Sequence, residues 1–377
     1  MGSAPPHQGD PLTDRYLPFR QVAKDLGVEA LALVPGCNFE RLYRKSFSSH
    51  ERPLVVFIPA QGDPAALVPN LELRSFDLLN FEGAVFDWRD QTGYQDAFEA
   101  LAAHLPMQSV AVEGQVMRVF VHHAMAKAWP QLTIVDAEKQ ISGLRLRKNA
   151  EEIEALEQAI RISQNALADV IKKVRPGLTE TEVETQLVQA LFANGAKEQS
   201  FRPIVAAGEN SARPHAHARP DYQIQAGDAL LIDFGARWSG LCADITRTFF
   251  VGHASDEAQE VYQTVLNANQ AGHALASPKV TAHQVDDEVT SLLEASSYAD
   301  RIRTKTGHGL GRAVHEDPYI MRGNHQQLDT GMVFTIEPGL YRVAPDGFGV
   351  RIEDDVLVTE DGCRSLTTFS RSLTVIG

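Results

Sequence analysis

The sequence predicts an α/β protein, of the α+β kind, with two domains, the second containing a curved sheet wrapped by helices. Three observations support this fold class. The chain has 377 residues, which is enough for two separate hydrophobic cores. Amphipathic segments with helical spacing alternate with short apolar runs typical of strands. In the second part, a long helix, a second helix and strands follow one another twice, which indicates an internal repeat.

The N-terminal part is predicted to form a small α/β domain. Residues 1–14 are polar and rich in proline and glycine, so we expect a disordered tail. Residues 15–140 contain a short helix over 17–26 and apolar strands over 30–34 and 54–59, which suggests a small mixed sheet. No group of residues with catalytic chemistry stands out in this domain.

The C-terminal domain, residues 141–377, is predicted to contain two similar halves. A long amphipathic helix opens the first half and stops before a Pro-Gly pair. The segment 179–182 (Thr-Glu-Thr-Glu) then has the pattern of a capping box that starts a second helix. The same order recurs in the second half, with a helix over 256–276 and the segment 281–284 (Thr-Ala-His-Gln). Two such halves facing each other would form a curved sheet with helices outside and polar side chains from both halves at its centre.

Two aspartates lie next to predicted strands of the first half. The apolar run 229–232 is typical of a strand buried on both faces, and it ends in Asp233. Asp244 opens the β-branched and aromatic run 245–251, a second strand. Because the turn between them resembles a hairpin, the two carboxylates can converge across paired strands. A buried carboxylate without a partner is costly, so a nearby cation is expected.

One histidine and two glutamates occupy comparable places in the second half. His308 lies among alternating glycines, which let the backbone approach an occupied site closely. Glu337 ends an apolar run, and Glu353 shares a strand face with Arg351 because strand side chains alternate. The four carboxylates and one imidazole form a hard donor set that suits Mn²⁺, Co²⁺ or Zn²⁺. A single such aspartate is usually a cap or a turn residue, but five donors in these positions indicate a metal centre.

The composition limits the possible partners. Acidic side chains outnumber basic ones by 49 to 35, and the net charge of −14 disfavours nucleic acid and anionic membranes. No apolar run approaches the roughly 18 residues of a membrane helix, and the start of the chain lacks the blocks of a signal peptide. Three widely separated cysteines show no spacing typical of metal sites or disulfides, so a reducing cytoplasm is the expected location.

Five short motifs, taken together, resemble those of the creatinase, aminopeptidase P and prolidase metallopeptidases, in the family's order and spacing. The likeness is strong from about residue 144 onward and weak before it. It implies a pita-bread fold and two divalent metal ions per chain, with Mn²⁺ favoured. The motifs are Ile-Asp-Phe-Gly (232–235), Asp-Ile-Thr-Arg-Thr (244–248), Gly-His-Gly-Leu-Gly (307–311), Thr-Ile-Glu-Pro-Gly (335–339) and Val-Arg-Ile-Glu-Asp (350–354).

The resemblance implies a role for each of the five donors. Asp244 and Glu353 would bridge the two metals, Asp233 would hold one of them, and His308 and Glu337 would hold the other. A hydroxide held between the metals would attack the peptide bond, because bound water is acidified. Glu337 would also carry a proton from the attacking water to the departing prolyl nitrogen.

Three further residues match family positions around the metals. His315, seven residues after His308, matches a histidine that contacts the substrate and the tetrahedral intermediate. A second family histidine, upstream of the first metal aspartate, matches either His215 or His217, and the Pro-His pair favours His215. Arg351 matches an arginine that orients the carboxylates, a role that suits a planar and permanently charged guanidinium.

The resemblance implies cleavage of X-Pro peptide bonds, and an Xaa-Pro dipeptidase (prolidase) is our first expectation. Aminopeptidase P, which removes the N-terminal residue from longer X-Pro peptides, is the alternative. Methionine aminopeptidases share the catalytic fold but usually lack such an N-terminal domain. A metal-free binding protein of the same fold is a remote alternative, because all five ligands are present. The resemblance also implies a homodimer.

A dipeptidase must bind the free carboxylate of the substrate proline, so a cation is expected in its site. Arg322 lies on the loop after His315 and could bind a carboxylate bidentately. Arg44, Lys45 and Arg41 belong to a segment that departs from the family pattern and could cover the site of a neighbouring subunit. Each of the four could equally be a solvated surface cation.

Overall fold

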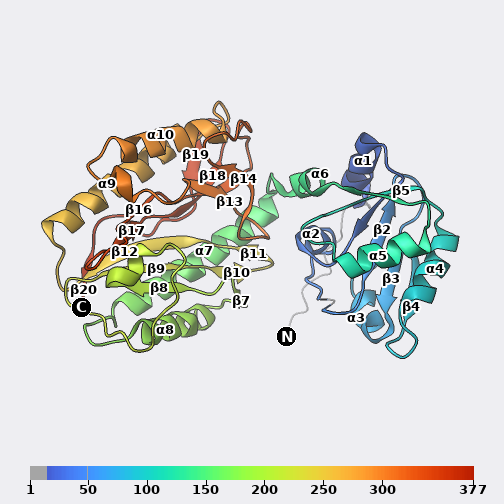
Figure 1. Ribbon diagram of the computed structural model, residues 1–377, viewed down its shortest axis with the longest axis horizontal. Coiled ribbons are helices and arrows are strands. Elements are labelled where there is room, and N and C mark those ends of the chain that lie inside the picture. The colour runs from blue at the N-terminus through green and yellow to red at the C-terminus, as the bar shows by residue number, and fades with distance from the viewer. Residues whose placement is uncertain (1–14, 49) are drawn as a thin grey trace, which may run out of the picture. The chain divides into compact units, whose positions relative to one another are not determined.

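The computed structural model describes residues 15–48 and 50–377 (Figure 1). The predicted disordered tail, residues 1–14, lies outside the described residues. The chain separates into two compact units: unit 1, which ends at Arg145, and unit 2, Leu146–Gly377. Each unit has its own sheets and its own buried hydrophobic clusters. Among the described residues, no helix is long and apolar enough to cross a membrane.

Unit 1 contains a six-stranded mixed sheet with the strand order β4-β3-β2-β1-β5-β6. Val56 and Ile58 of β2 pack in one hydrophobic cluster and Val55 and Phe57 in another, so the sheet is buried on both faces. The predicted helix and both predicted strands are confirmed. The strands are β1 (Ala30–Leu33), β2 (Val55–Pro59), β3 (Ala65–Pro69), β4 (Ala84–Trp88), β5 (Ser109–Val112) and β6 (Thr133–Asp136). The helices are α1 (Leu17–Leu26), α2 (Cys37–Tyr43), α3 (Leu73–Asp77), α4 (Gln95–His104), α5 (Val119–Ala128) and α6 (Glu138–Ser142).

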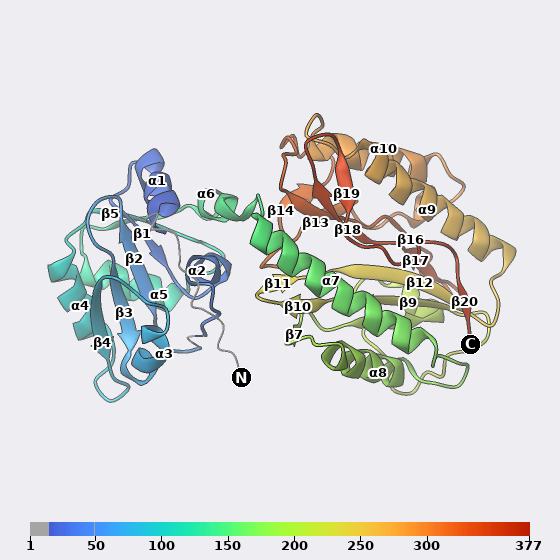
Figure 2. The same ribbon diagram turned by 180° about the vertical axis from the view of Figure 1, so that it is seen from behind.

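Unit 2 contains two helix–helix–strand halves, which confirms the predicted α/β class and pita-bread arrangement. The helices α7 and α8 flank the strands on one side, and α9 and α10 flank them on the other (Figures 1 and 2). These helices are α7 (Ala150–Ile171), α8 (Glu180–Ala193), α9 (Asp256–Leu275) and α10 (Ala282–Glu294).

Two larger sheets and two small ones make up the strands of unit 2. The first half contributes β8, β9 and β12 to the sheet β20-β12-β9-β8, which the C-terminal strand β20 completes, and the second half contributes the sheet β14-β13-β15-β18-β19. The strands of the first sheet are β8 (Ile204–Ala207), β9 (Ala229–Phe234), β12 (Ile245–Val251) and β20 (Val375–Ile376). Those of the second are β13 (Gly307–Gly309), β14 (Glu316–Ile320), β15 (Val333–Ile336), β18 (Asp354–Val358) and β19 (Cys363–Ser365). The small sheets contain β7 (Glu198–Gln199), β10 (Ala236–Trp238) and β11 (Leu241–Cys242), and β16 (Gly339–Tyr341) and β17 (Gly349–Arg351).

The internal repeat is visible at the starts of α8 and α10. Thr179 caps α8 in a capping box with Glu182, and Thr281 caps α10 in a capping box with Gln284. Both capping threonines also form an isolated β-bridge, Thr179 to Gln223 and Thr281 to Gln327. Both predicted capping boxes are therefore confirmed.

Strand pairing brings the metal-ligand candidates toward the centre of unit 2. β9 and β12 pair antiparallel, which places Asp233 opposite Thr246. The backbone N–H of Glu353 donates to the Thr246 carbonyl over 3.1 Å. This bond joins the strands of the first half to the segment between β17 and β18, so ligands from distant parts of the sequence meet.

Candidate metal centre

Three buried carboxylates form one side of the candidate centre. Asp233 lies near the end of β9, Asp244 directly precedes β12, and Glu353 lies between β17 and β18. One oxygen from each carboxylate lies within 4.8 Å of the others. The strand pairing described above therefore brings three carboxylates close enough together to bind the same metal ion.

His308 and Glu337 form the other side. The Nε2 atom of His308 lies 3.2 Å from Glu337 Oε1, and both residues group with Glu353 within 4.8 Å. The Nδ1 atom of His308 lies 3.1 Å from the carbonyl of Gly309, so a proton on Nδ1 would donate there and leave the Nε2 lone pair for a metal. A Cβ atom on Gly307 would lie 1.9 Å from the Thr335 carbonyl, so only glycine permits this close packing around His308.

The donor set fits divalent cations. The oxygen atoms Asp233 Oδ1 and Asp244 Oδ1 are buried and have no hydrogen-bond partner in the described part of the chain. Burial, with the charges of Glu353 and Asp233, raises the pKa of Asp244 well above its usual value. Burial and the neighbouring carboxylates do the same to the pKa of Glu353. Buried and mutually repelling carboxylates of this kind call for positive charge, and oxygen donors with one imidazole suit Mn²⁺, Co²⁺ or Zn²⁺.

Arg351 supplies part of that positive charge and fixes the carboxylates. Its Nη2 atom forms an ion pair with Asp233 Oδ2, and its Nε atom donates to Thr246 Oγ1 over 3.0 Å. The Thr246 hydroxyl donates in turn to Glu353 Oε2. Arg351 is buried and also donates to the Tyr341 hydroxyl over 2.9 Å. The guanidinium thus links candidate ligands from both halves, and its predicted orienting role stays a prediction.

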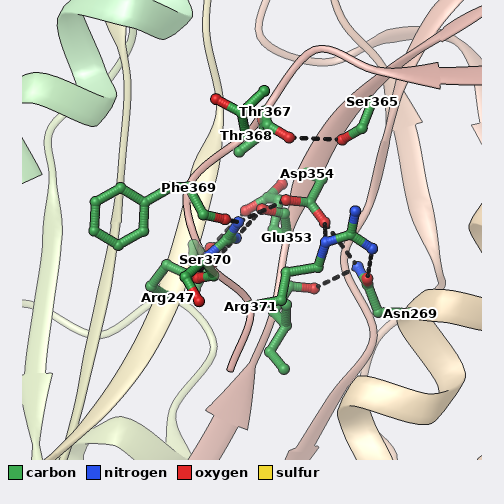
Figure 3. A network of polar contacts seen from close by, with 12 residues as sticks. Arg247, Asn269, Glu353, Asp354, Ser365, Thr367, Thr368, Phe369, Ser370 and Arg371 are labelled. Atoms are coloured by element: carbon green, nitrogen blue, oxygen red, sulfur yellow. Dashed lines mark hydrogen bonds and ion pairs between the residues drawn. The ribbon is translucent and has the colours of Figure 1, made fainter. Parts of the chain in front are cut away.

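Asp354, the residue after Glu353, forms a second network, in which both of its carboxylate oxygens are paired (Figure 3). Arg247 Nη2 lies 2.7 Å from Asp354 Oδ1, while Arg371 Nε and His273 Nε2 lie 3.2 and 3.1 Å from Oδ2. Burial alone would raise the pKa of Asp354, but the charge of Arg247 and the bond from His273 lower it to about 2. Arg247 also donates to the carbonyl of Glu353 over 2.6 Å, so the network holds the backbone of a candidate ligand.

His315 lies beside the candidate ligands. The ring centroids of His308 and His315 are 3.9 Å apart, and a ring nitrogen of His315 groups with Asp244 and His308 within 4.8 Å. Partial burial of its imidazole, with the charge of His308, lowers the pKa of His315 to about 4, so the ring is neutral near pH 7. The charge of His215 also acts on His315, and His215 is exposed. The carbonyl of His217 accepts a bond from Asn210, and no contact among the described residues places the His217 ring beside the candidate ligands.

Buried carboxylates on α8 and α10 hold the loops that carry these histidines. Glu180 accepts bonds of 2.7 Å from the backbone N–H groups of Ala207 and Arg219, which flank His215. Asp286 accepts bonds of 2.8 and 2.7 Å from those of Thr306 and Arg322, which flank His308 and His315. Each half therefore closes its histidine loop on one helical carboxylate.

The sequence did not identify these carboxylates or the Asp354 network. Glu180 has a local signal, since it stands at the start of a predicted helix. The partners of Asp286 and Asp354 lie far away in the sequence, so no local pattern reveals them.

The four predicted carboxylate-binding cations lie in two places. Arg322 is in unit 2, where it pairs with Asp287 and Glu294 of α10, each over 2.8 Å. Those bonds raise its pKa and occupy its guanidinium on the helix surface. Arg322 is therefore poorly suited to bind a substrate. Arg41, Arg44 and Lys45 lie in unit 1 at the end of α2, where Lys45 Nζ donates to the carbonyl of Leu78 over 2.8 Å. Their predicted role stays a prediction.

The chain is similar to known peptidases. Residues 154–360 match metallopeptidase family M24, and residues 19–147 match the creatinase/prolidase N-terminal domain. The chain is 32% identical over 356 residues to a probable dipeptidase, PepE, of Mycobacterium bovis, and the match covers 93% of each protein.

Solved structures give the same result. A prolidase from Thermococcus sibiricus matches with a TM-score of 0.91 and 31% identity, covering 98% of this chain and 100% of that one. An X-Pro aminopeptidase from Thermotoga maritima matches with a TM-score of 0.82 and 30% identity, covering 94% and 98%. The chain therefore belongs to metallopeptidase family M24, as its motifs predicted, and is a peptidase.

Proposed function

We propose that this peptidase is an Xaa-Pro dipeptidase with a dinuclear metal centre. The observation that carries the proposal is the convergence of five donors from both halves of unit 2, with unpartnered carboxylate oxygens beside an exposed histidine. The names of the similar proteins support the substrate class, since they include a probable dipeptidase and a prolidase.

The ligands would be Asp233, Asp244, His308, Glu337 and Glu353. Two divalent cations held there would polarise the scissile carbonyl and acidify a bound water. Around them, Arg351 and Thr246 keep Asp233 and Glu353 in place. The hydroxyl of Thr335 donates to Glu337 Oε1 over 3.2 Å and accepts from the backbone N–H of His308, so these two ligands share one support.

Proton transfer would fall to Glu337. Burial would raise the pKa of Glu337, but the bond to His308 and the charges of His308 and Arg351 lower it. An ionised carboxylate can accept the proton of the attacking water and deliver it to the prolyl nitrogen. His315 and His215 would donate hydrogen bonds to the substrate and to the oxyanion that forms during attack.

An aminopeptidase P is the alternative, because the Thermotoga maritima structure has the same fold at similar identity. Hydrolysis of Ala-Pro and of Ala-Pro-Pro with saturating Mn²⁺ discriminates between the two. A dipeptidase should cleave Ala-Pro faster. Faster cleavage of Ala-Pro-Pro would establish the aminopeptidase instead, and the absence of cleavage of either peptide would contradict both.

We further propose Mn²⁺ as the metal, a homodimer as the assembly and the cytoplasm as the location. The metal-free binding protein is disfavoured by the intact donor set. Measurement of bound metals in the purified protein and of its molar mass by light scattering tests the first two.

A further inference from the structure

The proposed dipeptide substrate carries a free carboxylate, and unit 2 offers a cation for it that the motifs did not indicate. An anion bound at this site needs a positive partner, because leaving it unpaired is costly. Arg322 already pairs with two carboxylates of α10. Lys305, by contrast, forms no ion pair with the described residues.

Lys305 lies on the segment that leads into β13 and His308. The next residue, Thr306, accepts a 2.7 Å hydrogen bond from the backbone N–H of Glu337 through its carbonyl. Lys305 therefore directly precedes a residue that binds the backbone of Glu337, a candidate metal ligand. Its side chain is half-buried.

The ammonium group is placed over an aromatic ring close to His315. Lys305 Nζ lies 5.4 Å from the ring centroid of Tyr319, within cation–π range. Tyr319 belongs to β14, four residues after His315, and β14 pairs with β13. Tyr319 is 36% exposed, so the ammonium group over its ring lies at an accessible edge of the site.

Within residues 15–48 and 50–377, the ammonium of Lys305 has no ion pair and no hydrogen bond with another residue. Its charge nevertheless acts on the centre, since it contributes to lowering the pKa values of Glu337 and His315. In the described part of the chain, Lys305 thus places a positive charge without an ion pair at the edge of the candidate metal centre that carries His315.

We propose that Lys305 is a specificity-determining residue that binds the free α-carboxylate of an X-Pro dipeptide. The ammonium forms a charge-assisted hydrogen bond with the carboxylate, and the cation–π contact with Tyr319 holds it there. A longer peptide has an amide at this position and gains no ion pair. This inference rests on the proposed dipeptidase function and explains how the site would select dipeptides.

The test compares Ala-Pro with Ala-Pro amide, which lacks the carboxylate charge. For wild type we expect a higher kcat/KM for Ala-Pro. Lys305→Met should lower the ratio of the two kcat/KM values by roughly 10- to 100-fold, mainly through KM for Ala-Pro. Lys305→Arg should restore most of the ratio. The matched control is Arg303→Met, which removes an exposed cation of the same segment and should leave the ratio unchanged.

Inhibition by L-proline and by prolinamide provides a second measurement on the same variants. Lys305→Met should weaken inhibition by proline and spare inhibition by prolinamide. Metal content is measured in parallel, so that loss of the centre is not mistaken for loss of the carboxylate site.

Two outcomes overturn the role of Lys305: an unchanged ratio in Lys305→Met, or a collapse of the ratio in Arg44→Ala or Arg322→Ala instead. Failure of the proposed function has a different signature, because wild type would then cleave Ala-Pro-Pro faster than Ala-Pro. A wild type that prefers Ala-Pro, together with an unaffected Lys305→Met, overturns only the inference about Lys305.

Discussion

Glu353 and Asp354 are adjacent in the chain, yet they lie in opposite electrostatic environments (Figure 3). Glu353 faces a group of buried carboxylates, and burial with their repulsion raises its pKa well above the usual value. Asp354 faces Arg247, Arg371 and His273, and its pKa is lowered to about 2. The alternation of side chains around a strand produces this difference. On the face of Asp354 the protein supplies the compensating positive charge, whereas on the face of Glu353 Arg351 supplies only part of it.

The largest effect is expected on the paired face. Arg247→Met would remove the 2.7 Å ion pair with Asp354 and the bonds that Arg247 donates to the carbonyls of Glu353 and Ser370. Removing one partner of a buried pair typically costs about 3–5 kcal/mol. Urea unfolding of the metal-free protein checks this. As a control, Arg237→Met removes a more exposed pair with Glu198 and should cost less than about 1 kcal/mol. Equal costs for the two variants would contradict the comparison.

On the metal face, two neighbouring histidines separate metal binding from catalysis. His308→Ala should lose metal, because its Nε2 atom is directed at the other ligands. His315→Ala should retain the metals and lower turnover by roughly 10²-fold or more through loss of transition-state stabilisation. Since His315 also lies within reach of Asp244 and His308, the metal content of the variants decides. Equal metal loss in both would make His315 a ligand.

The pH dependence of stability should have opposite signs on the two faces. A lowered pKa means that Asp354 contributes stability in full above about pH 4, and that this contribution is lost as the pH falls toward 2. A shift of this size corresponds to about 2 kcal/mol. The raised pKa of Asp244 has the reverse effect: in metal-free protein its stabilisation is present at low pH and is lost as the pH rises.

Unfolding measured against pH, with a chelator present, tests these signs. In wild type the free energy of unfolding should fall between pH 4 and 2, and Asp354→Asn should reduce this fall. Asp244→Asn should keep the fall between pH 4 and 2, and it should remove part of the decline in the free energy of unfolding at higher pH. If Asp244→Asn instead removed the loss of stability between pH 4 and 2, that loss would come from Asp244, and its assignment to Asp354 would be wrong.

Local sequence patterns predicted the parts of this account that depend on neighbouring residues. The capping boxes at Thr179 and Thr281 need only four residues each, and both are formed. Period-two alternation placed Arg351 and Glu353 on one face, where Thr246 Oγ1 now links them.

Partners that are distant in the sequence escaped prediction. Asp354 binds Arg247 and Arg371, which lie 107 and 17 residues away, and the sequence around Asp354 does not predict these pairs. Arg322 was predicted to be able to bind a substrate carboxylate because it lies on the loop after His315. The carboxylates that occupy it, Asp287 and Glu294, come from α10 at separations of 35 and 28 residues.

The metal centre itself is tested most directly by titrating metal-free protein with Mn²⁺ and measuring stoichiometry by calorimetry and stability by urea unfolding. Asp244 is the informative position, because its Oδ1 atom is buried without a partner and its neighbours repel it. Wild type should bind two ions per chain and become more stable on binding. Metal-free Asp244→Asn should be more stable than metal-free wild type, by about 1 kcal/mol, because one repelling charge is gone. It should also bind fewer ions and gain less from them. A wild type that binds no Mn²⁺, or an Asp244→Asn variant that binds two ions with unchanged affinity, would contradict the account.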